Sequence, residues 1–100
     1  EVQGSFARPV KRVNAALEHL FKRAQFVGKE LGLNLEWKDS GGCCDGNNLA
    51  HHGLPVLDTL GVRGGEIHSP NEFILLDSLG ERAALSTLLL IDFAQKEKRL

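Results

Sequence analysis

A single apolar stripe near the start of the chain constrains the fold more than any other feature. Its members recur at alternating intervals of three and four residues, and they are Val10, Val13, Leu17, Leu20, Ala24, Val27 and Leu31. This spacing places them on one side of a helix, so residues 10–31 are predicted to form one long helix that packs on a sheet. Pro9 suits its first turn and Gly32 suits its C-terminal cap. The charged residues on its other side, Lys11 among them, are expected to face solvent.

The middle of the chain alternates strand patterns with one short helix pattern. Alternating apolar and polar residues predict a strand at Leu33–Trp37, and apolar runs predict strands at Leu54–Leu57 and Glu72–Asp77. Val2–Ala7 is a further candidate. Between the first two strands, Asp45 suits the N-cap of a short helix that runs to about His52 and is ended by Gly53. These short elements, each followed by a turn signal, indicate a layered fold rather than a helical bundle.

A second long helix is predicted at the C-terminal end. It begins at a capping-box pattern, Ser78 with Glu81, and runs to about Lys96. Its side chains are apolar nearly all round, at Leu85 and at Leu88–Ile91. A helix of this kind is usually covered on both sides, so we expect it between a sheet and another layer. The order of the elements along the chain therefore predicts an α/β fold.

Size, composition and charge exclude several classes of protein. The 100 residues suit one domain, and the fractions of hydrophobic (42%) and charged (25%) residues are those of a globular protein, not of a disordered one. The formal net charge of −1 argues against nucleic-acid binding, which depends on clustered Lys and Arg. Apolar runs such as Leu88–Ile91 are far shorter than the roughly 20 residues of a membrane span, so no membrane association is expected.

The absence of methionine and the positions of the two cysteines are also informative. The chain contains no Met and begins at Glu1, so we expect a segment or a processed product of a longer protein. The two cysteines, Cys43 and Cys44, are adjacent, and adjacent cysteines rarely bridge each other because the disulfide strains the peptide between them. No disulfide framework is therefore predicted, which favours a reducing, cytoplasmic location.

Two loops hold the candidate functional residues. In residues 40–48, Gly41 and Gly42 precede a predicted helix, where backbone N–H groups can bind a carboxylate or phosphate, although a simple tight turn needs the same glycines. In residues 64–72, His68 is a candidate metal ligand between two chain breakers. A catalytic zinc needs about three protein ligands, and the other histidines do not supply them.

Cys44 offers a competing interpretation. Near the start of a helix it is a candidate thiol nucleophile, and His68 is the loop histidine that could serve as its base. The alternative is that Cys43 and Cys44 are small buried residues. From these residue types alone, a metal site, a thiol enzyme and a packing role stay open.

Taken in order, several segments resemble the C-terminal end of the zinc-dependent peptidase family M20, most closely its glutamate carboxypeptidase branch. The matching segments are Ser40–Asn48, Gly53–Pro55, Asp58–Gly61, Gly64–Ser69, Glu72–Phe73 and Asp77–Leu79. The resemblance implies that residues 10–100 are the C-terminal part of a three-layer α/β catalytic domain of the zinc-exopeptidase type. It also implies that residues 1–9 are the end of an inserted lid domain and the hinge, and that the parent forms a homodimer through that lid.

The same resemblance assigns roles to individual residues. His68 matches the last zinc ligand of the family, and Arg8 matches a position close to the hinge. The substrate pocket is expected to be lined by Gly41, Gly42, Cys43, Cys44 and Asp45, with Arg8 nearby. Many relatives have Ser at the position of Cys44, and because a thiol is the weaker hydrogen-bond donor, this departure puts the substrate preference in doubt.

The resemblance implies a carboxypeptidase or deacylase that hydrolyses an amide bond of an acidic or N-acylated amino acid, in a small peptide or N-acyl amino acid substrate. It also implies two zinc ions in the parent, with the site incomplete in this chain. The other zinc ligands and the glutamate base of the family lie upstream of this sequence, so we expect residues 1–100 alone to be inactive. A non-catalytic interaction module and a thiol-dependent hydrolase that uses Cys44 are the two alternatives.

Overall fold

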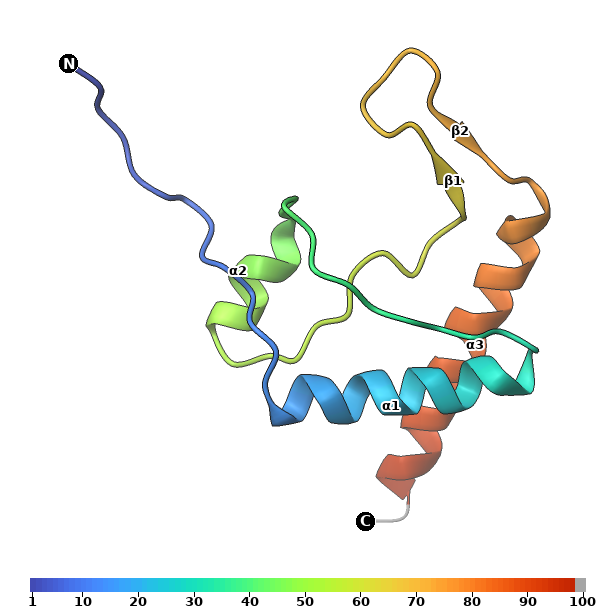
Figure 1. The fold of residues 1–100 in the computed structure, drawn as a ribbon. Coiled ribbons are helices and arrows are strands. Elements are labelled where there is room, and N and C mark those ends of the chain that lie inside the picture. Colours follow the sequence, from blue (N-terminus) through green and yellow to red (C-terminus); the bar gives the residue numbers. More distant parts are fainter. Residues whose placement is uncertain (99–100) are drawn as a thin grey trace.

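The computed structural model describes residues 1–98, which form three helices and one small sheet. In chain order these are α1 (Ala15–Glu30), α2 (Asp45–His51), β1 (Gly64–Gly65), β2 (Phe73–Ile74) and α3 (Asp77–Lys98) (Figure 1). The radius of gyration is 16.1 Å, larger than the roughly 13 Å of a compact domain of this length. The elements therefore spread over more space than one closely packed domain of 100 residues would occupy. No helix within residues 1–98 is long and apolar enough to cross a membrane.

Helix α1 begins five residues later than the apolar stripe predicts. Asn14 is the N-cap of this helix. Its backbone is extended, and its Oδ1 accepts the N–H of Leu17 at 2.9 Å. Val10 and Val13 lie before this cap and are 76% and 53% exposed. The predicted start at residue 10 and the predicted packing of Val13 are therefore wrong, and Pro9 is not in a helical turn.

The C-terminal end of α1 agrees with the sequence. Leu31 is the C-cap, and the next residue, Gly32, has a left-handed φ of 74°. Its N–H donates to the carbonyl of Lys29 at 3.0 Å, which satisfies one of the carbonyl groups left free at the helix end. Glycine reaches this conformation without the steric cost that a side chain would add.

The core lies between α1 and α3, which are packed across each other (Figure 1). Its buried members are Ala24 and Val27 of α1 and Leu85 and Leu89 of α3. The apolar stripe of α1 thus packs on a helix, not on a sheet as predicted. An ion pair from Arg23 to Asp92 lies beside this core and joins the same two helices.

Most of the predicted strands are absent from residues 1–98. The segments Leu33–Trp37 and Leu54–Leu57 carry no strand, and neither does Val2–Ala7. Residues 33–40 instead run as an extended segment, with Leu35 held by a hydrogen bond from Gln25 and Trp37 stacked on Phe21 (Figure 1). A strand needs a neighbour that pairs with its backbone, and residues 1–98 place none beside these segments.

The sheet is limited to one antiparallel pair, β1 with β2. Gly64 pairs with Ile74 and Gly65 pairs with Phe73, so the strand predicted over residues 72–77 is reduced to two residues. The two strands approach each other so closely that a Cβ on Gly64 would lie 2.1 Å from the carbonyl oxygen of Phe73. The pairing therefore requires glycine at this position.

Helix α3 begins at Asp77 without the predicted capping box. The hydroxyl of Ser78 is buried, accepts the N–H of Arg63 at 2.9 Å and donates to the carbonyl of Leu75 at 2.6 Å. Glu81 forms an ion pair with Arg63 instead of turning back to the helix start. The hydroxyl thus connects the helix to Arg63, the residue before β1, rather than closing its own first turn.

The outer side of α3 is not covered within the described part of the chain. Leu85 and Leu89 are buried against α1, whereas Leu90 is 69% exposed and Ile91 is 47% exposed. The expectation that the helix lies between a sheet and another layer is therefore not met by residues 1–98. A small helical core with one two-stranded sheet neither establishes nor excludes a three-layer α/β domain.

Candidate functional site

Two of the residues nominated from the sequence meet at the start of α2. The guanidinium of Arg8 forms an ion pair with the carboxylate of Asp45, with Nη2 and Oδ1 2.9 Å apart. The Asp45 side chain is 91% exposed, so solvent screens this pair and it adds little stability. Its consequence is positional, because it brings the segment before α1 against the glycine-rich loop of residues 41–45.

The first turn of α2 is capped by Cys44 rather than by Asp45. The Cys44 Sγ accepts the N–H of Gly46 at 3.3 Å, and the Cys44 N–H donates to Oδ1 of Asn47 at 3.1 Å. The same Asn47 side chain donates through Nδ2 to the carbonyl of Pro9 at 2.9 Å. Asp45 has already entered the helix, and the sequence pattern placed the cap one residue too late. Gly53 follows the end of α2 with a φ of 93°, as predicted.

Lys11 and Asp58 form the centre of the site, although sequence analysis gave neither of them a role. The Lys11 Nζ donates to Oδ2 of Asp58 at 2.5 Å and to the carbonyl of Val56 at 2.9 Å. The other oxygen of Asp58, Oδ1, accepts the thiol of Cys44 at 3.1 Å. The side chains of Lys11 and Asp58 are only 18% and 28% exposed, so this ion pair is better shielded from water than that of Arg8.

Lys11 was expected to face solvent because the predicted helix included it. The helix begins at Ala15, so Lys11 belongs to the preceding segment and reaches across to Val56 and Asp58. One sequence feature could have pointed to Asp58: it lies in the segment Asp58–Gly61, which resembles the M20 pattern. The resemblance assigns no role to Asp58 itself.

The side chains of Asp58, Val56 and Cys44 pack closely against Gly46 of α2. A Cβ on Gly46 would lie 2.6 Å from Oδ1 of Asp58, 3.0 Å from Cγ1 of Val56 and 3.2 Å from Sγ of Cys44. Gly46 is buried and lies inside a helix, where glycine lowers helix stability relative to alanine. Close approach to Asp58 and Cys44 is the physical reason for glycine at this position.

The environment of Asp58 shifts its ionisation. Burial raises the pKa of Asp58, but the hydrogen bonds from Lys11 and Cys44, together with the charge of Lys11, outweigh it and leave the pKa below its ordinary value. The carboxylate is therefore the form that the folded chain stabilises.

This shift gives a stability prediction for the variant Asp58→Asn. An unfolded Asp has a pKa of about 3.9, and the folded value is lower, so Asp58 adds stability above that pH and loses the contribution as the pH falls through the folded pKa. The variant is expected to lower the free energy of unfolding at pH 7 by about 1–2 kcal/mol. Urea unfolding between pH 7 and pH 3 measures the difference, which should shrink toward the acid end. A difference that is independent of pH contradicts the prediction, and Asp39→Asn, at an exposed position, is the control.

The remaining nominated residues of the glycine-rich loop are open to solvent. Gly41, Gly42 and Cys43 are exposed, and the loop has a turn-like bond from the N–H of Gly42 to the hydroxyl of Ser40 at 3.2 Å. Both cysteines are free thiols and both are exposed, so the interpretation of Cys43 and Cys44 as small buried residues is wrong.

His68 lies in the turn between β1 and β2, which Figure 1 shows apart from α2. It is exposed and has a φ of 64°, and Glu66 in the same turn has a φ of 58°. The Ser69 hydroxyl donates a hydrogen bond to the carbonyl of Glu66 at 2.7 Å, and this bond closes the turn. The structure does not bring His68 together with the residues around Asp58.

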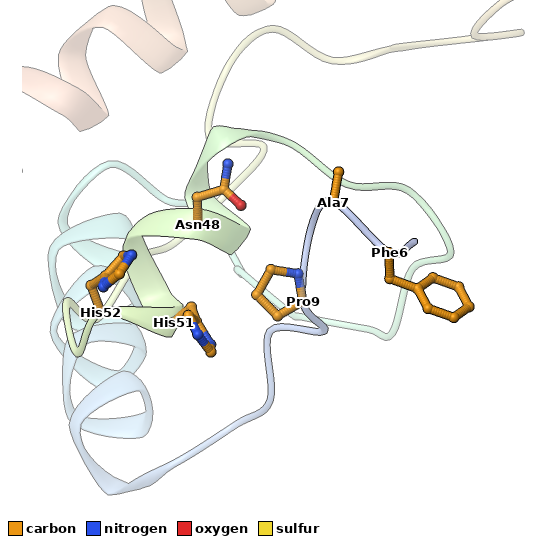
Figure 2. A pocket seen from close by; sticks show the side chains of 6 residues that line it. All are labelled: Phe6, Ala7, Pro9, Asn48, His51 and His52. Atoms are coloured by element: carbon orange, nitrogen blue, oxygen red, sulfur yellow. The ribbon is translucent and has the colours of Figure 1, made fainter. Parts of the chain in front are cut away.

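A depression lies between α2 and residues 6–9 (Figure 2). It is lined by Phe6, Ala7, Pro9, Asn48, His51 and His52. The rings of His51 and His52 are nearly perpendicular, with centroids 5.4 Å apart, and they leave the helix in different directions (Figure 2). Within residues 1–98, no group of three or more His, Cys, Asp or Glu side chains could hold a metal ion.

Within residues 1–98, the hydrogen-bond partners of Cys44 include no histidine. The partners of Cys44 are the carboxylate of Asp58, the N–H of Gly46 and the amide of Asn47. The thiol thus donates its proton toward a carboxylate that Lys11 already holds, whereas nucleophilic activation pairs the thiol with a histidine. His68, the base that the thiol alternative requires, belongs to the separate turn between β1 and β2.

Comparison of the chain with protein-family models, with curated proteins and with solved structures finds no match. A functional proposal therefore rests on the geometry of two regions. One comprises residues 8–11, 41–47 and 56–58, and the other is the turn that holds His68.

Proposed function

We propose that this chain is the C-terminal part of the catalytic domain of an M20-type zinc metallohydrolase. The reaction is hydrolysis of an amide bond of an acidic or N-acylated amino acid, and the substrates are small peptides or N-acyl amino acids. The proposal includes two zinc ions in the parent protein, a cytoplasmic location and a homodimer formed through a lid domain. The ordered series of motifs from Ser40 to Leu79 supports it.

The conformation of His68 is the observation that carries the proposal. A φ of 64° is uncommon for a residue other than glycine, and such backbone strain is concentrated at functional sites. The imidazole is exposed, and it makes no hydrogen bond to other side chains or backbone groups of residues 1–98. A strained turn that presents a free imidazole supports a role as a ligand better than a role in packing.

The residues described here do not by themselves fit a zinc centre, because they offer His68 as a single ligand and no cluster of three. In the proposal, His68 completes a site whose other ligands come from outside residues 1–98.

The glycine-rich loop supports a substrate-binding role. Its residues Gly41–Cys43 are exposed, and it is fastened at Cys44 to Asp58 and at Asp45 to Arg8. In the proposal, the backbone N–H groups of Gly41 and Cys43, which make no hydrogen bond within residues 1–98, receive the carboxylate end of the substrate.

The exposed apolar residues support a larger domain. Phe73 and Ile74 of β2 are 49% and 47% exposed although they lie on opposite sides of the strand, and Leu90 of α3 is exposed as well. Surfaces of this kind are normally covered by further strands or helices. A non-catalytic interaction module would present the same surface, so activity has to decide between the two.

Hydrolysis of a panel of N-acyl amino acids and dipeptides by the intact protein tests the proposal. Turnover should disappear with a chelator and return with added zinc, and Cys44→Ser, which keeps a hydrogen-bond donor at this position, should retain most of it. Turnover that survives the chelator and is lost on alkylation would instead support the thiol hydrolase. The absence of turnover in the zinc-loaded intact protein would favour the interaction module.

Residues 1–100 produced alone are expected to bind zinc weakly and to hydrolyse none of these substrates. A single imidazole competes poorly with water and buffer for the metal. Isothermal titration with zinc and the same amidase panel measure both properties. Robust amidase activity of this segment would contradict the assignment of the missing ligands to other parts of the protein.

A further inference from the structure

We propose that Asp58 is a positioning residue that holds the glycine-rich loop 41–45 against residues 8–11, acting through Cys44 and Lys11. The family resemblance gives Asp58 no role, and its two carboxylate oxygens are used separately. Oδ1 accepts the thiol of Cys44 at 3.1 Å, and Oδ2 accepts the ammonium of Lys11 at 2.5 Å. One carboxylate thus joins three segments that are far apart in the sequence.

The links between these segments converge on the start of α2. Asn47 donates to the carbonyl of Pro9, and Arg8 pairs with Asp45, beside the link through Asp58. The pair of Arg8 is exposed, whereas that of Lys11 and Asp58 is mostly shielded. Because shielding strengthens a charged hydrogen bond, Asp58 carries more of the fastening than Asp45.

The carboxylate has little freedom to move. Gly46 approaches it so closely that a Cβ there would lie 2.6 Å from Oδ1. The next residue, Thr59, has a φ of 61°, which is rare for a β-branched side chain, and its hydroxyl donates to the carbonyl of Asp58 at 2.6 Å. Backbone strain on one side and close packing on the other keep the carboxylate directed at Cys44 and Lys11.

The loop depends on this contact for its order. Among the described residues, the loop before Cys44 has one hydrogen bond of its own, from Gly42 to the neighbouring Ser40. Its C-terminal end is attached through Cys44, whose thiol both caps α2 and donates to Asp58. Loss of the carboxylate should therefore loosen the loop while the core of α1 and α3 stays intact.

Hydrogen–deuterium exchange of the intact protein tests this directly. In Asp58→Asn and in Cys44→Ala, peptides that cover residues 41–49 should exchange about tenfold faster, as expected for the loss of a hydrogen bond to a charged group. Cys44→Ser keeps a donor and a cap, so its exchange should stay within about twofold of the original. The double variant Asp58→Asn/Cys44→Ala should exchange no faster than the faster of its two single variants, because both changes remove the same link.

Two controls separate positioning from general loss of stability. Leu89→Val lowers stability from the core of α1 and α3, and its peptides over residues 41–49 should exchange as in the original protein under native conditions. Asp39→Asn changes an exposed carboxylate before the loop and should have no effect. Unchanged exchange in Asp58→Asn, or equal acceleration in Leu89→Val, would overturn the proposed role of Asp58.

A kinetic measurement extends the test, and this part alone rests on the proposed function. If the loop binds substrate, Asp58→Asn should raise KM at least about threefold and change kcat by less than about twofold, and Cys44→Ser should restore KM in comparison with Cys44→Ala. Faster exchange in a protein without amidase activity would leave the positioning role standing and refute the proposed function. Amidase activity with unchanged exchange and unchanged KM would refute the positioning role alone.

Discussion

Replacing His68 with alanine is expected to lower the amidase turnover of the intact protein by at least about a hundredfold, with a matching loss of bound zinc. The reason is positional, since the exposed imidazole lies in a strained turn where it makes no hydrogen bond within residues 1–98. The free energy of unfolding should change by less than about 1 kcal/mol, because no apolar core depends on this side chain.

The measurements are the metal content, the turnover and the melting temperature of each variant. His68→Asn is the backbone-matched variant, because Asn tolerates a positive φ while it removes the imidazole, and it should lose metal and turnover as His68→Ala does. His51→Ala and His52→Ala are the controls, since both residues line the separate depression in Figure 2. Full metal content and full turnover in both His68 variants would show that the residue is not a ligand.

Replacing Leu85 with alanine is expected to cost about 2–5 kcal/mol in the free energy of unfolding. Leu85 is fully buried between α1 and α3, in the cluster with Ala24 and Val27. The truncation removes apolar contacts and leaves a cavity that two packed helices cannot fully close. Urea unfolding followed by circular dichroism measures the loss, and a value under about 1 kcal/mol would contradict this description of the core.

Leu90→Ala is the informative partner of that variant. Leu90 lies on the same helix and is 69% exposed in residues 1–98, so a loss below about 0.5 kcal/mol is expected if this side faces solvent. In an intact protein whose further layers cover α3, the loss should approach that of Leu85→Ala. The comparison therefore tests the proposed three-layer domain without any measurement of activity.

The helices were predictable to the extent that short-range signals define them. The centre of α1, the placement of α2 before Gly53 and the length of α3 follow from spacing and from chain-ending residues. The errors lie at the starts, where more than one residue can supply a cap. Asn14 and Cys44 each take a role that the pattern gave to a neighbouring position or omitted.

The candidate site was predictable only in part. The loop patterns nominated residues 41–45 and His68, and the family resemblance nominated Arg8. The structure brings Arg8 to that loop but not His68. Lys11 and Asp58 were not assigned, because they are 47 residues apart and nothing in either local pattern refers to the other. Contacts of this kind depend on how the intervening segments fold back, which periodicity does not encode.

What the sequence by itself determined is local: the apolar stripe of α1, the glycine that ends it and the two free thiols. Tertiary structure alone decided that the stripe packs on α3, that Ser78 binds Arg63 rather than closing a capping box, and that Asp58 joins Cys44 to Lys11. The physical reason is that a helix satisfies its hydrogen bonds within four residues, whereas strands, buried charges and hydroxyl groups need partners from distant segments. For the same reason the segments at residues 33–37 and 54–57 have strand patterns without strands, because a β-strand exists only where a neighbour pairs with it.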